Sequence, residues 1–89
     1  MKVLIVGSGA REHAMAWKLA GERQVSEVLC APGNPGIAPI ARCVPADPCV
    51  PTSVLSVVDR ERIDLTVIGP ELPLSLGVVD LIASRGHPT

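Results

Sequence analysis

Along the chain, short apolar runs typical of buried strands alternate with segments whose apolar residues have helical spacing. Residues 2–6 form a short run, rich in β-branched side chains, that is apolar on both faces, as in a central parallel strand. A helical pattern with many alanines covers residues 10–20. A second apolar run, residues 25–31, stops at a segment of prolines, glycines and an asparagine, which cannot continue a regular element. The pattern therefore predicts a strand, a helix and a second strand.

The face that the first helix turns toward the sheet is predicted to carry small residues, because these let a helix lie close to the strands. The residues expected on or beside this stripe are Ala14, Ala16, Trp17, Leu19, Ala20 and Gly21. Arg11, Glu12 and Lys18 are expected to point to solvent.

The pattern is weaker between residues 37 and 50, where a short strand is expected near residues 42–44. Pro51 suits the first position of a helix over residues 52–62. The inner face of this helix is predicted to carry Val54, Leu55, Val57 and Val58.

Residues 63–69 predict a further strand, with Leu65 and Val67 on one face. A last helix is expected over residues 74–85, and the sequence stops at Thr89, where a fifth strand would begin. Repeated strand–turn–helix units predict an α/β fold. We expect a doubly wound, Rossmann-like parallel sheet of about four strands, with helices on both faces and the final strand truncated.

The length of 89 residues leaves room for one small domain, expected to be single and incomplete over residues 1–89. Trp17 is the only aromatic residue, so the core must be built from Val, Leu, Ile and Ala. The net charge is −1 and the basic residues are scattered, which argues against a nucleic-acid or membrane partner. Because the apolar runs are too short for a signal peptide or a membrane span, we expect a cytoplasmic protein.

The three cysteines, Cys30, Cys43 and Cys49, do not have the spacing of a metal site. An odd number in a chain expected to be cytoplasmic favours reduced thiols that pack in the core. The sequence therefore offers no candidate metal ligand.

Three segments rich in glycine and proline follow predicted strands and would meet at one edge of a parallel sheet, where ligands bind. The first, residues 7–11, opens the first helix, and the backbone N–H groups of Gly9, Ala10 and Arg11 are the expected donors to a polar or anionic ligand. It is not a full dinucleotide-binding motif, because Glu12 takes the place of the third glycine. A P-loop is excluded because no Gly-Lys-Ser/Thr follows.

Taken together, three segments resemble the N-terminal domain of phosphoribosylamine–glycine ligase, also called glycinamide ribonucleotide synthetase. They are residues 7–13 (GSGAREH), residues 31–36 (APGNPG) and residues 64–74 (DLTVIGPELPL). The resemblance covers nearly the whole chain and is weakest between residues 37 and 53. Ala10 departs from it, since many members of the family have glycine there.

The resemblance implies the pre-ATP-grasp domain of a ligase of de novo purine biosynthesis. In that family ATP phosphorylates the carboxylate of glycine, and the amine of 5-phosphoribosylamine attacks the acyl phosphate to form glycinamide ribonucleotide. ATP and Mg²⁺ or Mn²⁺ would bind outside this chain, so we expect no catalytic residue and no bound cofactor here. The implied partners are the phosphoribosyl substrate and the ATP-grasp and C-terminal domains. The 89-residue chain alone is expected to be inactive.

The substrate-binding residues that the resemblance implies are Gly7, Gly9, Ala10, Arg11, Gly33, Asn34, Pro70 and Glu71. Glu71 would accept hydrogen bonds from the ribose diol or pair with the substrate amine; the alternative is an acid that opens the last helix. Asn34 would bind ligand or hydrogen-bond its own backbone as an Asx turn. Arg11 would pair with the phosphate or with a carboxylate of another domain, or is an ordinary exposed helix residue.

Two functions of other classes stay open. One is a stand-alone Rossmann-like nucleotide-binding module, which measured binding of NAD and ADP would separate from a ligase domain. The other is an interaction module of the receiver type. A receiver needs a cluster of acids after its first strand, and residues 7–9 have none.

Overall fold

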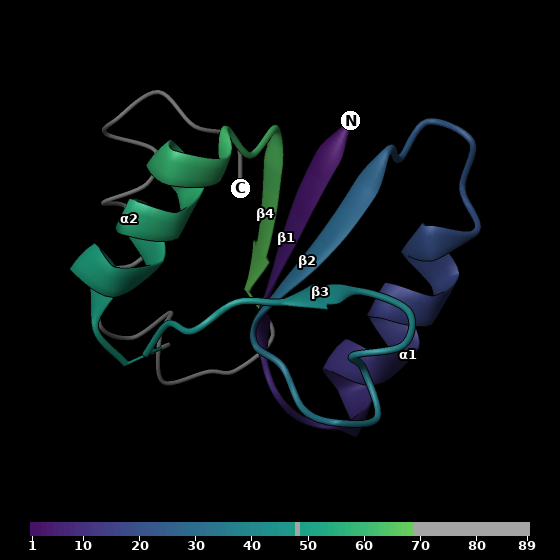
Figure 1. Cartoon of the computed structure of the whole chain (residues 1–89), viewed down its shortest axis with the longest axis horizontal. Helices are drawn as coiled ribbons and strands as arrows, with labels where there is room; N and C mark the ends of the chain where they lie inside the picture. Colours follow the sequence, from purple (N-terminus) through teal and green to yellow (C-terminus); the bar gives the residue numbers. More distant parts are fainter. Residues whose placement is uncertain (48, 69–89) are drawn as a thin grey trace.

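The structure, a computed structural model, describes residues 1–47 and 49–68. In these ranges the chain forms one parallel sheet with the strand order β3-β2-β1-β4 and two helices beside it (Figure 1). The elements are β1 (Lys2–Gly7), α1 (Ala10–Ala20), β2 (Glu27–Pro32), β3 (Arg42–Cys43), α2 (Pro51–Glu61) and β4 (Leu65–Ile68).

β1 lies inside the sheet, because four consecutive apolar residues can be buried only where both faces and both edges of a strand are covered. Val3, Leu4, Ile5 and Val6 have no exposed surface. β1 pairs along its whole length with β2 and along four residues with β4. The first apolar run of the sequence is therefore the centre of the fold.

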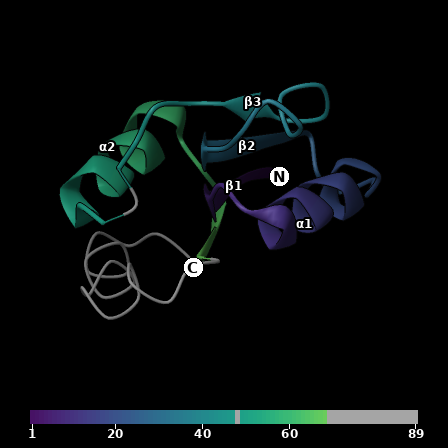
Figure 2. The same cartoon turned by 90° about the horizontal axis from the view of Figure 1, so that it is seen from below.

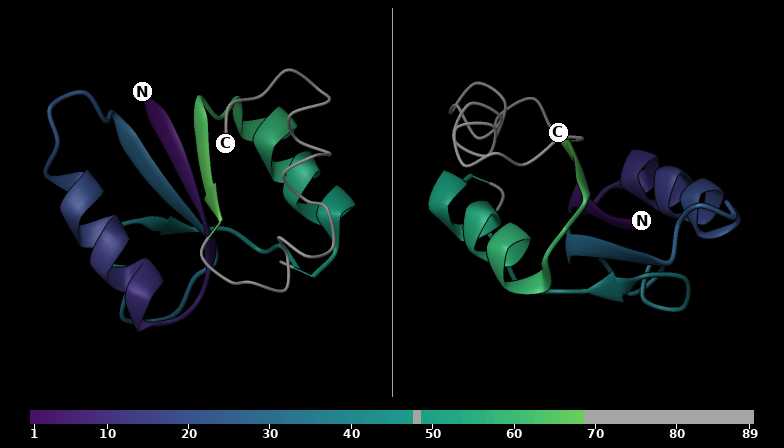
Figure 3. Two further views of the ribbon diagram at one scale, coloured as in Figure 1. Left: turned by 180° about the vertical axis from the view of Figure 1, so that it is seen from behind. Right: turned by 90° about the horizontal axis from the view of Figure 1, so that it is seen from above.

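α1 and α2 cover opposite faces of the sheet (Figure 2). The chain moves from β1 outward to β2 and β3, then returns past β1 to β4, and the views from behind and from above show the two helices on either side (Figure 3). The core on the α2 face consists of Leu4, Val6, Leu29, Ala31, Val44, Val54, Leu55, Val57, Val58 and Ile63. The core on the α1 face consists of Val3, Ile5, Ala16, Val28, Cys30, Ile37 and Ala41. The prediction of a doubly wound α/β sheet is confirmed.

The predicted elements that fall on described residues agree with the structure to within two residues. α1 has the expected bounds, and α2 begins one residue early, with Pro51 in its first turn. β2 begins at Glu27, two residues late, because its register is set by pairing with β1. The inner face of α2 and the shared face of Leu65 and Val67 are as predicted. The last predicted helix, residues 74–85, lies outside the described residues.

The inner face of α1 differs from the prediction. Glu12 and Ala16 are its buried residues, whereas Trp17 is 69% exposed and Ala14 is exposed. The expectation that Glu12 points to solvent is wrong, and so is the placing of Ala14, Trp17, Ala20 and Gly21 toward the sheet, since all four are exposed. The placing of Ala16 and Leu19 is confirmed. Residues four apart share a helix face, so the inward turn of Glu12 brings Ala16 to the sheet and leaves Trp17 outside.

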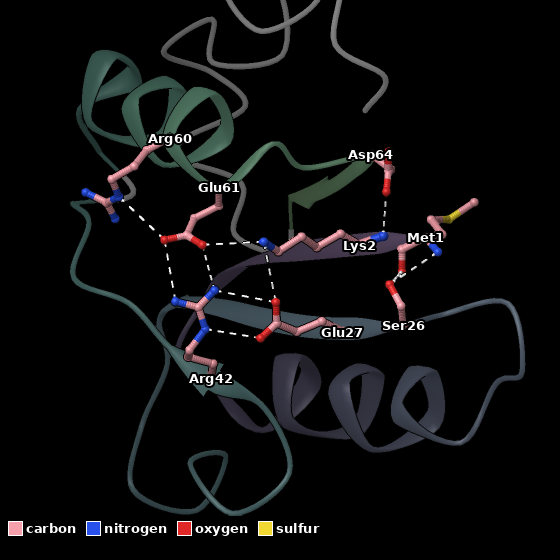
Figure 4. A network of polar contacts seen from close by, with 8 residues as sticks. All are labelled: Met1, Lys2, Ser26, Glu27, Arg42, Arg60, Glu61 and Asp64. Atoms are coloured by element: carbon pink, nitrogen blue, oxygen red, sulfur yellow. Dashed lines mark hydrogen bonds and ion pairs between the residues drawn. The ribbon is translucent and has the colours of Figure 1, made fainter.

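Five charged side chains form a network that joins the amino ends of β1 and β2 to β3 and α2 (Figure 4). Arg42 Nε lies 3.2 Å from Oε2 of Glu27, and Arg42 Nη2 lies 2.6 Å from Oε1 of Glu61. Lys2 Nζ lies 3.5 Å from one oxygen of each carboxylate, and Arg60 contacts Glu61 as well. These side chains form a connected network rather than an isolated pair.

Hydrogen bonds from Arg42 lower the pKa of both Glu27 and Glu61 below the ordinary value of 4.5, and Lys2 lowers both further. A carboxyl group whose pKa is lower in the folded protein stabilises the fold above its unfolded pKa. That stabilisation is lost as the pH falls through the folded pKa. The network therefore stabilises the fold at neutral pH and stops doing so in acid.

We expect the melting temperature of the chain to fall as the pH drops below about 4.5, and to fall less in Arg42→Ala, which lacks the main cause of both pKa shifts. Circular dichroism melts between pH 7 and pH 3 measure this. Arg23→Ala, which changes the net charge equally at an exposed position, is the control. An Arg42→Ala protein with the acid profile of the wild type would contradict the assignment.

Thr66 places a hydroxyl group in the core. The residue is 1% exposed, and Oγ1 has no hydrogen-bond partner in the described part of the chain. A buried polar group without a partner costs about 1–3 kcal/mol. The second residue of β4 is thus a local weakness of the sheet.

Thr66→Val should raise the free energy of unfolding by about 1 kcal/mol, because it replaces the unpaired hydroxyl by a methyl group of similar shape. Urea unfolding should show a higher midpoint with an unchanged m-value. The exposed Thr52 gives the control Thr52→Val, for which little change is expected. Equal effects at the two positions would show that the Thr66 hydroxyl is not a source of instability.

Candidate functional site

The carboxyl ends of β1 and β2 lie together at one edge of the sheet, where the two strands converge near the middle of Figure 1. Gly7, the last residue of β1, is paired with Pro32, the last residue of β2. On the other side of β1, the end of β4 at Ile68 is paired with Val6. The strand order reverses at this point, and open α/β sheets bind their ligands there.

The backbone at this edge requires glycine at two positions. Gly7 has φ +141°, and a Cβ there would lie 2.5 Å from Cγ of Glu12. Gly33 has φ +73°, and a Cβ there would overlap Sγ of Cys43. The N–H of Gly33 donates to the carbonyl of Gly7 at 3.0 Å, so the turn after β1 and the loop after β2 are joined directly. Side chains larger than hydrogen would separate them.

Glu12 lies beneath the turn after β1 and is only 4% exposed. Its Oε2 accepts a hydrogen bond from the N–H of Gly9 at 3.1 Å. An acid at the third position of a helix that reaches back to the residue before the helix is a common N-terminal cap. The N–H of Gly9, which we predicted as a donor to ligand, is therefore engaged within the chain. The N–H groups of Ala10 and Arg11 remain predicted donors.

Asn34 uses one end of its amide group to reach the turn after β1 and the other end to brace its own loop. Nδ2 donates to the carbonyl of Ser8 at 2.7 Å, and Oδ1 accepts from the N–H of Ile37 at 3.0 Å. The ring of His13 packs at the same place, since a Cβ at Gly36 would lie 3.3 Å from its Cε1. Asn34 thus holds the loops in position, and direct contact with a ligand stays a prediction.

Two cysteine thiols support the same loops. Cys30 Sγ donates to the carbonyl of Gly7 at 3.4 Å, and Cys43 Sγ donates to the carbonyl of Asn34 at 3.7 Å. Cys30 is buried, and burial raises its pKa to about 11, so the thiol keeps its proton at neutral pH and remains a donor. All three cysteines are free, and the prediction that they pack in the core is wrong for Cys49, which is exposed.

The structure brings together the predicted site residues that it describes. They are Gly7, Gly9, Ala10, Arg11, Gly33 and Asn34, and among them Gly9, Ala10 and Arg11 are exposed. Pro70 and Glu71 lie outside the described residues and remain predictions. The sequence prediction missed Glu12, although an acid three residues after a helix-opening glycine is a signal for such a cap. It also missed the roles of Cys30 and Cys43, which depend on the pairing of β2 with β3.

Other features of the described residues lie apart from this edge. A cavity of about 440 Å³ opens at the amino end of β2, where Glu27, Ile40 and Arg42 line it. Within residues 1–47 and 49–68, no group of three or more His, Cys, Asp or Glu side chains could hold a metal ion. Neither α1 nor α2 has the length and hydropathy that a membrane span requires.

Comparison with known proteins gives a consistent result. Residues 1–89 match the family described as "Phosphoribosylglycinamide synthetase, N domain". Similar curated proteins named phosphoribosylamine–glycine ligase include those of Pseudomonas putida, 51% identical over 88 residues, Xanthomonas campestris, 50% over 90, and Clostridium acetobutylicum, 43% over 86. Each match covers 97% of this chain but only 20% or 21% of the relative. The chain therefore spans about one fifth of the length of these relatives.

The family match extends over every residue of the chain, including the glycine turn after β1 and the Asn34 loop after β2. The chain belongs to the phosphoribosylglycinamide synthetase N-domain family.

Proposed function

We propose that this chain is the substrate-side domain of a phosphoribosylamine–glycine ligase, with residues 1–89 forming a single, incomplete domain. The observation that carries the proposal is the family match over the whole chain, which coincides with a sheet edge where two glycine loops are joined. The relatives from Pseudomonas putida, Xanthomonas campestris and Clostridium acetobutylicum are each named phosphoribosylamine–glycine ligase.

The proposed reaction joins glycine to 5-phosphoribosylamine and converts ATP to ADP and phosphate, in de novo purine biosynthesis in the cytoplasm. ATP with Mg²⁺ or Mn²⁺ would activate the glycine carboxylate in an ATP-grasp domain outside this chain. The described residues offer no cluster that could hold that metal ion. The role proposed for this chain is to bind and orient the phosphoribosyl substrate, and the ATP-grasp and C-terminal domains are its proposed partners.

The loops at the carboxyl edge suit that role because they are held in place before a ligand arrives. The N–H of Gly33 and the amide of Asn34 fix one loop to the other. Gly9 and Ala10 expose backbone to which a ligand can approach closely, and Arg11 contributes an exposed cation beside them. A site that is ordered in advance loses less entropy on binding.

A stand-alone dinucleotide-binding module is less well supported. The position of the third glycine is filled by the buried Glu12, which lies against Gly7 and Gly9. β2 ends at Ala31 and Pro32, without the acid that would hold the ribose of a dinucleotide. Measured binding of NAD and ADP to this chain should therefore be absent.

The proposal is tested with a chimeric ligase in which this chain replaces the matching segment of the Pseudomonas putida relative. The two segments are 51% identical over 88 residues, so we expect the chimera to form ADP in a reaction that depends on glycine and phosphoribosylamine. The 89-residue chain alone should form none. The relative without its matching segment is the control for background turnover.

A folded chimera that binds ATP but makes no glycinamide ribonucleotide would contradict the proposed function. So would glycine-dependent ADP release by the isolated chain.

In the same chimera, Asn34→Ala should raise the KM for phosphoribosylamine about tenfold, with a smaller change in kcat. The substitution removes two hydrogen bonds that position the loops, each contributing about 1 kcal/mol. Asn34→Asp keeps the acceptor for Ile37 but turns a carboxylate oxygen toward the carbonyl of Ser8, so its KM should rise at least as much as in Asn34→Ala. Gln24→Ala, at the opposite end of the sheet, is the control, and an unchanged KM in Asn34→Ala would rule out the positioning role.

A further inference from the structure

Glu12 brings a buried negative charge to the place where an α/β fold usually binds an anion. The positive end of the α1 dipole and the backbone N–H groups of its first turn would normally attract a phosphate. Here Oε2 of Glu12 already accepts the hydrogen bond of Gly9 at 3.1 Å. The protein's own carboxylate thus serves as the anion of this helix terminus.

The carboxylate lies immediately under the backbone that a ligand would approach. A Cβ at Gly9 would be 3.0 Å from Oε2, and a Cβ at Gly7 would be 2.6 Å from Oε1. The side chain is 4% exposed, so water screens its charge poorly. A phosphate bound to the amides of this turn would lie within a few ångströms of a like charge, which strongly disfavours it.

We propose that Glu12 determines how the phosphoribosyl substrate is oriented, by making the Gly7–Gly9 turn reject phosphate. The ligand identity rests on the function proposed above. Phosphoribosylamine has a dianionic phosphate at one end and an amine at the other, and the amine is the end that can carry positive charge. The amine and ribose end therefore faces the turn, and the phosphate lies away from it. Glu12 acts through Gly9 and is a positioning residue rather than a catalytic one.

Arg11 provides the competing possibility, because it is an exposed cation next to the same turn. If its guanidinium outweighed the buried carboxylate, the turn would bind phosphate in the wild-type protein and the charge of Glu12 would matter little. The two possibilities predict different responses to removal of that charge: stronger phosphate inhibition in the first case and little change in the second.

Glu12→Gln in the chimeric ligase separates them, because the amide oxygen can still accept the Gly9 hydrogen bond while the charge is removed. We expect inorganic phosphate to become at least a tenfold stronger competitive inhibitor against phosphoribosylamine. The KM for phosphoribosylamine should rise, with a smaller change in kcat. Glu22→Gln makes the same charge change at an exposed position past the other end of α1 and should leave phosphate inhibition unchanged. Equal phosphate inhibition in Glu12→Gln and the wild type would overturn the proposal.

A measurement on the wild-type 89-residue chain keeps the test independent of the variant and of ligase activity. Titration with inorganic phosphate, followed by the amide NMR signals of Gly9 and Ala10, should show no saturable shift. A saturable shift at these amides would overturn the orientation proposed here. A chimera without ligase activity would instead count against the proposed function, while a saturable shift in this titration would still contradict the proposed orientation.

Discussion

The pairing of β1 between β2 and β4 is the constraint on which the rest of the structure depends. Because the strand is buried on both faces and both edges, its register fixes its neighbours, with Lys2 opposite Glu27 at one end and Gly7 opposite Pro32 at the other. The loop after β2 therefore leaves the sheet beside the turn after β1, and the N–H of Gly33 reaches the carbonyl of Gly7. The candidate site follows from this register.

Most of the fold could be predicted because local patterns of apolar residues and prolines in the sequence indicate the strands and α2. Four consecutive apolar residues required a buried strand, and Pro51 with the stripe of Val54 and Val58 defined α2. The face of α1 could not be predicted from polarity alone. Glu12 was expected in solvent, but its bond to Gly9 places a charged residue inside and leaves Trp17 outside. A local hydrogen bond overrode the hydrophobic pattern.

The positions of the glycine loops at the candidate site could be predicted from the sequence, but the side chains that hold these loops in place could not. Glycines at positions 7 and 33 mark loops at strand ends, and both have positive φ in the structure. The groups that hold these loops come from neighbouring strands and loops: the thiols of Cys30 and Cys43 and the amide of Asn34. Their partners depend on the pairing of β2 with β1 and β3, which no short stretch of sequence encodes. Pro70 and Glu71 stay predictions.

The two ends of the sheet use different chemistry, and the difference bears on function. At the amino end, opposite the proposed site, Arg42 and Lys2 pair with Glu27 and Glu61. At the carboxyl end the loops are joined by amides and thiols, which are neutral. Such a neutral framework would leave the proposed phosphoribosyl ligand to respond to the charges of the described side chains beside it. Oε2 of Glu12 contacts the N–H of Gly9 directly, at 3.1 Å, so its buried charge can act on the proposed orientation.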